Sequence, residues 1–196
     1  MAKRVSRVDE FAAKFRALVE QAERDTPEFA AIAFDQAQEW YPNAHKVCLD
    51  LSEKYDVYFT KVMGIMAAMS IQTRWEKNLA DTEKFLRGDV VSGLPIRVKK
   101  AHEVMGIKHG HDVDEIMRVL NGPKIQCFFD NILLRNRSKR STIDTWMCKI
   151  IDHEAGIKGA DYRDAETACN MVADERKIQR PAMQAWMWIL VRGKAD

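Results

Sequence analysis

One carboxylate in this chain stands where it could do chemistry. Asp144 follows the hydroxyl residues Ser141 and Thr142 and precedes an apolar segment, which predicts that it lies at the start of a helix. The basic loop, residues 135–140, comes just before it and contains four cations and no acid. An ionised carboxylate beside concentrated positive charge is suited to a reaction on a polyanion, and nucleic acid is the commonest polyanion.

Asp144 has two interpretations. The positive end of a helix would hold its carboxylate ionised, and such a group can stabilise an oxocarbenium-like centre or activate a nucleophile. Ser141 or Thr142 would then cap the helix. An aspartate in this position can also be a simple helix cap, but the basic loop favours the catalytic interpretation.

The elements that must position these residues are helices. Of the 196 residues 46% are hydrophobic, glycine and proline are scarce, and helix-period apolar patterns recur along the chain. Thr26 and Pro27 predict a helix that runs to about Trp40, and another follows over 43–54. Residues 57–70 are apolar on nearly every face and predict a buried central helix. We therefore expect an all-α fold of about ten helices.

The composition indicates which metal sites and which cellular location to expect. The net charge is only +2, and the four cysteines form no CxxC pair, which argues against zinc ribbons and iron–sulfur clusters. The cluster His109-Gly110-His111-Asp112 could ligate a metal, but nothing nearby supplies a third fixed ligand, and we expect Asp112 to cap a helix. No apolar run approaches the roughly 20 residues of a membrane helix. We expect a cytoplasmic protein, in the host cytoplasm if it is viral, with no metal, cofactor or membrane contact.

Three motifs carry a resemblance to a known family. They are Leu120-Asn121-Gly122-Pro123-Lys124, Ile143-Asp144-Thr145-Trp146-Met147 and, upstream, Ala68-Met69-Ser70-Ile71-Gln72-Thr73. In order and spacing they resemble the hairpin, the catalytic aspartate motif and the Leu-Ser-Ala-Gln-Thr segment of helix-hairpin-helix DNA glycosylases of the endonuclease III type. The resemblance covers about residues 57–155. It implies one two-lobed glycosylase-like unit, with lobe 1 at about 55–142 and lobe 2 formed by 1–54 and 143–196.

The resemblance also implies site residues. Asp144 and Gln72 would be catalytic, facing a base that is flipped into a cleft between the lobes. The hairpin and the basic loop would bind DNA through Gly122, Lys124, Gln126, Arg135, Arg137, Lys139 and Arg140. The base pocket would be lined by Ser70, Trp75, Asn131, Trp146 and Gln184.

Plainer interpretations of these residues stay open. The hairpin can be an ordinary turn between helices, the basic loop can be merely solvated, and Gln72 can cap a helix. Most of the tryptophans can belong to the core.

Three positions depart from the family pattern, and one of them bears on whether the reaction can pass through a Schiff base. Lys124 stands where the family's hairpin has its second glycine, and Trp146 replaces a histidine. Gln126 stands where bifunctional members carry a lysine that attacks the sugar as an amine. The resemblance therefore implies a monofunctional glycosylase that forms no Schiff base.

Two other functions stay open. The short chain, the altered hairpin and the helix around 128–132 also resemble compact glycosylase-related proteins of bacteriophages. That likeness implies transfer of an amino acid or polyamine to an activated 5-hydroxymethyluracil in DNA. The third possibility is a non-catalytic DNA-binding module. DNA is the expected partner in all three, and a small amine or amino acid is a co-substrate in the second.

Overall fold

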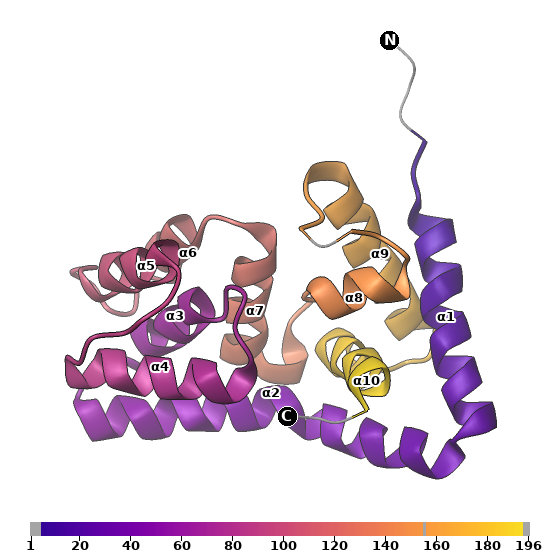
Figure 1. Cartoon of the computed structure of the whole chain (residues 1–196), viewed down its shortest axis with the longest axis horizontal. Helices are drawn as coiled ribbons and strands as arrows, with labels where there is room; N and C mark the ends of the chain where they lie inside the picture. Colours follow the sequence, from indigo (N-terminus) through magenta and orange to yellow (C-terminus); the bar gives the residue numbers. More distant parts are fainter. Residues whose placement is uncertain (1–4, 155, 194–196) are drawn as a thin grey trace. The chain divides into compact units, whose positions relative to one another are not determined.

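The computed structural model of the protein describes residues 5–154 and 156–193, and this part of the chain confirms the all-α prediction (Figure 1). It contains ten α-helices and one short 3-10 helix, η1, without a strand among the described residues. The helices are α1 (Val8–Asp25), α2 (Pro27–Tyr55), α3 (Phe59–Met69), α4 (Trp75–Arg87), α5 (Pro95–Met105), α6 (Val113–Leu120), α7 (Pro123–Leu134), α8 (Thr145–Ile150), α9 (Gly159–Glu175) and α10 (Arg180–Arg192), with η1 at Arg135–Arg137. None of these helices is long and apolar enough to cross a membrane.

The chain folds into two compact units. Unit 1 consists of the described residues in 5–42 and 134–193, and unit 2 consists of residues 43–133. The resemblance implied lobe boundaries at about 55 and 142. Along the chain, the two compact units of the structure meet within α2 and at the end of α7. His45 gives one reason for the earlier boundary, because its Nδ1 lies 2.8 Å from the carbonyl oxygen of Ile132 and ties this part of α2 to α7.

Helix α2 also corrects a sequence prediction. We expected one helix to end near Trp40 and another to cover 43–54, but the structure has a single helix with Pro42 inside it. Proline has no N–H to donate to the carbonyl four residues earlier, which is that of Gln38. The side chain of Asn136 supplies the missing donor, with Nδ2 2.6 Å from the Gln38 oxygen. The sequence could not show this compensation, because the donor lies far along the chain.

Helix α3 forms the centre of unit 2, as the sequence predicted. Every residue of α3 except Phe59 and Lys61 is buried, and the helix packs on α4, α5 and α6 (Figure 1). Gly64 allows the closest approach, because a Cβ atom there would lie 2.8 Å from Cγ2 of Ile116. Beside this core, Arg97 of α5 and Asp81 of α4 form a buried ion pair at 2.7 Å.

Helix α10 is to unit 1 what α3 is to unit 2, a largely buried helix on which other helices pack. It contacts α1, α8 and α9, and residues 181–187 are buried without a break. Helix α1 lies along α9, where the two pairs Arg16–Glu175 and Glu23–Arg176 join them, each through two hydrogen bonds. These helices hold the segment that carries Asp144.

Candidate functional site

Asp144 is the N-cap of α8. Its Oδ1 atom accepts hydrogen bonds from the backbone N–H groups of Trp146 at 2.9 Å and Met147 at 3.0 Å. Its Oδ2 atom accepts a third from the indole Nε1 of Trp188 in α10, at 3.1 Å. Three N–H groups therefore fix a half-buried carboxylate in one orientation.

The helix is not capped by the two hydroxyl residues that the sequence offered for this role. Ser141 donates instead to Oδ1 of Asn170 at 2.8 Å. Thr142 is buried, with its Oγ1 3.3 Å from the hydroxyl of Tyr41. Both side chains face the interior of unit 1, which leaves the cap position to Asp144.

The indole that binds Asp144 and the indole of Trp146, two residues after it, each carry a cation on the ring. We call Trp146, Lys149, Trp188 and Arg192 the indole–cation cluster. The Nζ atom of Lys149 lies 3.9 Å from the ring centroid of Trp146, and the guanidinium carbon of Arg192 lies 4.1 Å from that of Trp188. Trp40 of α2 packs edge-on against Trp188, with 5.8 Å between the ring centroids. Both indoles of the cluster are half-buried, so part of each remains open to a ligand.

Arg192 has unused hydrogen-bonding capacity. Its Nη1 atom is buried and has no hydrogen-bond partner among the described residues. A buried guanidinium nitrogen without an acceptor is costly, and an anion or a carbonyl oxygen would remove that cost.

The basic loop is anchored to α2 and α10. The bond from Asn136 to Gln38 holds its 3-10 turn, and Nη1 of Arg180 donates to the carbonyl oxygen of Lys139 at 2.7 Å. The loop is therefore held by its backbone and by Asn136, which leaves the side chains of Arg135, Arg137 and Lys139 exposed.

The cations of unit 1 differ in what they contact. Arg16, Arg176 and Arg180 each pair with a carboxylate at 2.7 to 2.8 Å. Among the described residues no carboxylate lies within 4.0 Å of Arg135, Arg137 or Lys139. Arg140 is the exception within the basic loop, because its Nε lies 3.1 Å from Oε1 of Glu166. Three of the four cations of the basic loop therefore have no acidic partner among the described residues.

Gln184 lies in the interior of unit 1. It is only 5% exposed, and its Oε1 accepts a hydrogen bond from the Tyr41 hydroxyl at 2.8 Å. Its amide therefore belongs to a buried polar contact beneath α10. Of the two predicted base-pocket residues in unit 1, Gln184 and Trp146, it is Trp146 that lies next to Asp144, since its backbone N–H donates to the Asp144 carboxylate.

The other predicted residues belong to unit 2. The hairpin is built as the sequence indicated: Asn121 ends α6 in a left-handed conformation with φ of 39°, and Pro123 begins α7. Gln126 turns back and donates through Nε2 to the carbonyl oxygen of Met117 at 2.8 Å, which closes the hairpin. Gly122 and Lys124 are half-exposed in this turn.

The turn after α3 holds three more of the predicted residues. Ser70 donates to the carbonyl oxygen of Ala67 at 2.7 Å, and Trp75 is half-buried at the start of α4. Gln72 is exposed, with a left-handed φ of 52°. Asn131 of α7 is fully buried.

Sequence reasoning missed part of the surroundings of Asp144. Lys149 stands three residues after Trp146, and Arg192 stands four residues after Trp188, spacings that place each cation beside its ring on a helix. That spacing could have revealed both pairs. The contact between Trp188 and Asp144 spans 44 positions and leaves no local signal.

Thiol and metal chemistry find no support in the described residues. All four cysteines are free and buried, and burial raises the pKa of the Cys48 and Cys169 thiols to about 12. No group of three or more histidine, cysteine, aspartate or glutamate side chains in that part of the chain could hold a metal ion.

Comparison with known proteins gives one result. No curated protein and no solved structure matches the chain. A family model described as a family of unknown function, DUF7178, matches residues 26–195, which include α2 to α10. The chain therefore belongs to the family DUF7178.

Proposed function

We propose that the protein acts on bases in DNA, as a monofunctional glycosylase-like enzyme with Asp144 as its catalytic carboxylate. The observation that carries the proposal is the position of that carboxylate. It is oriented by three N–H donors, and it lies in the segment that follows directly on the basic loop with its three exposed cations.

Each part of unit 1 would have a role in this reaction. Arg135, Arg137 and Lys139 would contact phosphates, and the open parts of Trp146 and Trp188 would stack on a base. The free Nη1 of Arg192 would meet an acceptor on the nucleotide.

The reaction would be a hydrolysis of the bond between base and sugar. The base leaves with the electron pair of its bond to C1′, and the carboxylate of Asp144 stabilises the positive charge that develops there. Water then adds to C1′ and loses a proton, and the departed base gains one, which gives a C1′ hydroxyl and a neutral free base. Gln126 carries an amide, which is not a nucleophilic amine, and its Nε2 donates a hydrogen bond to the carbonyl oxygen of Met117. Both facts fit a mechanism without a Schiff base.

One observation favours a second candidate function, a DNA-binding module without catalysis. Both oxygens of Asp144 already accept hydrogen bonds, and two of these bonds cap α8. A helix cap would account for this residue completely. The cations of the basic loop would then bind DNA whose bases are left unchanged.

A product screen tests both functions. DNA containing damaged or modified pyrimidines would be incubated with the protein and digested, and the nucleosides would be measured by mass spectrometry. Free base or an abasic site is the expected product. A heavier nucleoside would overturn hydrolysis in favour of group transfer to the base, and unchanged DNA that remains bound would favour the binding module.

Two matched variants make the test specific for Asp144. D144N keeps an oxygen that can cap α8, and it should abolish turnover while DNA binding persists. Asp112 caps α6 in unit 2 by accepting from the N–H of Glu115 at 2.8 Å, so D112N is the control for loss of an N-cap carboxylate. D112N should keep full activity. Full activity in D144N would refute the proposed role of Asp144.

A further inference from the structure

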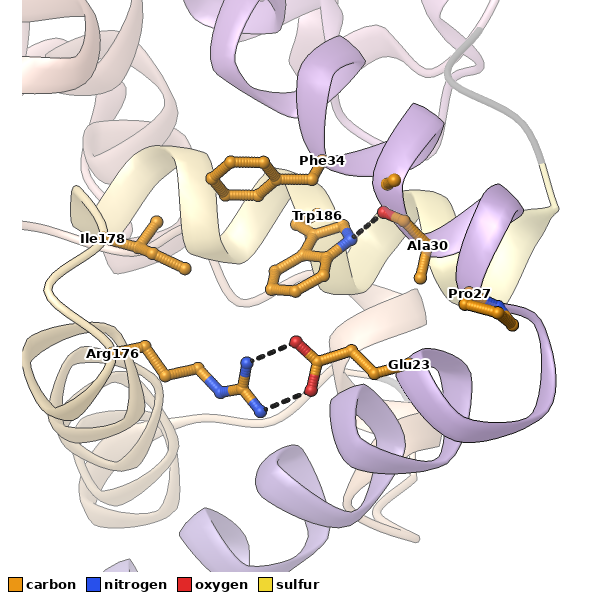
Figure 2. Close-up of a pocket in the computed structure, with 8 residues that line it drawn as sticks. Glu23, Pro27, Ala30, Phe34, Arg176, Ile178 and Trp186 are labelled. Atoms are coloured by element: carbon orange, nitrogen blue, oxygen red, sulfur yellow. Dashed lines mark hydrogen bonds and ion pairs between the residues drawn. The ribbon is translucent and has the colours of Figure 1, made fainter.

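A pocket of about 510 Å³ opens in unit 1 between α1, α2, α10 and the turn that follows α9 (Figure 2). Ala30 and Phe34 of α2, Ile178 of the turn and Trp186 of α10 give it an apolar lining. This volume lies within the range of sites for small organic molecules, and an apolar lining with few polar groups is typical of such sites.

The pocket is separate from the surroundings of Asp144. Trp186 and Trp188 are two positions apart in α10, so their side chains leave the helix about 200° apart. Trp188 reaches Asp144, whereas Nε1 of Trp186 donates to the carbonyl oxygen of Ala30 at 2.9 Å. Phe34 packs edge-on against Trp186 with 5.0 Å between the centroids. The indole N–H is thus satisfied. Trp186 is only 4% exposed, and the guanidinium carbon of Arg176 lies 5.8 Å from its ring centroid, so only a small part of the ring reaches the pocket (Figure 2).

Next to Trp186, the pocket is lined by an ion pair, whose Arg176 guanidinium carbon lies 5.8 Å from the Trp186 ring centroid. Nη1 and Nη2 of Arg176 donate to Oε1 and Oε2 of Glu23 at 2.7 and 2.9 Å, and Figure 2 shows the pair facing Trp186. The Glu23 side chain is 44% exposed and that of Arg176 is 26% exposed. Each carboxylate oxygen can accept another hydrogen bond, and the guanidinium group has five N–H groups, of which this pair uses two. The ion pair therefore offers an acceptor and a donor side by side without net charge.

We propose that this pocket binds a neutral, planar heteroaromatic ring that carries an N–H donor next to a carbonyl acceptor. The ring lies beside Phe34 and Ile178, which are only half-buried, its N–H donates to Glu23, and its carbonyl accepts from Arg176. A charged ligand would be attracted by one member of the ion pair and repelled by the other. A bicyclic ring fits the volume of the pocket. Asp144 has no part in this site, so this proposal and the proposed function succeed or fail separately.

The probes for the test are 2-quinolone, which has the donor beside the acceptor, and N-methyl-2-quinolone, which lacks the donor. Binding to the full chain would be followed through the indole N–H signals in proton–nitrogen NMR spectra. We expect 2-quinolone to shift the Trp186 signal with a Kd of about 1 mM or tighter. N-methylation should weaken binding about tenfold, because it removes a hydrogen bond to a charged group. Equal binding of the two probes, or a shift at another tryptophan alone, would overturn the assignment.

Substitutions locate the site without disturbing the core. Ala31 lines the pocket and is exposed, so A31W fills the pocket and should weaken 2-quinolone binding more than tenfold. Ile32, next to it, is 56% exposed and does not line the pocket, so I32W should bind as the wild type does. Undiminished binding to a folded A31W variant would refute the site.

A second pair of variants tests the ion pair. E23Q should weaken 2-quinolone binding about fivefold and leave N-methyl-2-quinolone unaffected, because the charged acceptor is lost. E175Q is the control, since Glu175 pairs with Arg16 between the same two helices but outside the pocket. Equal effects of E23Q and E175Q would show that the acceptor has no role.

Discussion

The indole N–H of Trp188 donates to Oδ2 of Asp144 at 3.1 Å, so α10 determines the direction in which this carboxylate points. The N-terminus of α8 binds only the other oxygen. The orientation of the candidate catalytic group therefore depends on tertiary packing as well as on its own helix.

The first prediction concerns this contact. W188F removes the hydrogen bond to a charged group and should lower the free energy of unfolding by about 1.5–3 kcal/mol, measured by urea denaturation. In a double-mutant cycle W188F should couple to D144N by about 1 kcal/mol or more. W186F loses an indole hydrogen bond to Ala30 instead and serves as the control. Coupling of D144N to W186F as strong as to W188F would contradict the argument.

The second prediction concerns the basic loop. If the loop binds phosphates, the double variant R137A/K139A should weaken DNA binding. The plot of the logarithm of the binding constant against the logarithm of the salt concentration should also become less steep, by about 2 in the magnitude of its slope. The measurement is a salt series of fluorescence anisotropy titrations. R163A/K177A removes two other exposed cations of unit 1 and should leave the slope unchanged. A slope that is the same in all three proteins would exclude the basic loop as the phosphate contact.

The third prediction concerns the proline inside α2. N136A should destabilise the protein by about 1–3 kcal/mol, because the carbonyl of Gln38 loses its donor. In P42A the new backbone N–H can bond that carbonyl, so N136A should cost less in the P42A background than in the wild type. Thermal unfolding of the four proteins measures both values. An equal cost of N136A in both backgrounds would show that Asn136 does not replace the missing helix bond.

The fourth prediction concerns acid stability in unit 2. Burial raises the pKa of Asp81, but the hydrogen bonds and charges of Lys77 and Arg97 outweigh burial, and the pKa is lowered overall. A lowered pKa in the folded state means that the pair stabilises the protein above the unfolded pKa of about 4. This stabilisation disappears as the pH falls through the folded pKa.

Urea unfolding between pH 7 and pH 2 measures this dependence. D81N should lower stability by about 3–5 kcal/mol at pH 7, because it leaves the buried Arg97 without a counter-ion. The difference from the wild type should shrink below pH 4. D89N, at the exposed pair with Arg87, should change stability little at any pH. A difference between D81N and the wild type that stays constant down to pH 2 would contradict the prediction.

Local signals predicted the helices well. Pro123 and Asn121 marked the hairpin, and the apolar run before Ser70 marked the buried helix α3. The local signals failed where a distant residue decides whether a helix continues. Asn136 donates to the carbonyl that Pro42 leaves without a partner, and the helix therefore runs on through the proline. The same limit applies to the candidate site. Asp144 could be found from its sequence context, but its bond to Trp188 and the burial of Gln184 depend on how α10 packs.

The division of the chain has a consequence for its synthesis. Unit 2 is one uninterrupted stretch, whereas unit 1 needs segments from both ends of the chain. On the ribosome, every residue of unit 2 has been made before α8, α9 and α10 exist, so unit 2 can fold first. Helix α1 and the first half of α2 must wait with their apolar faces uncovered until α9 and α10 emerge. Nascent chains stalled shortly after residue 134 should therefore depend on chaperones that shield these two helices.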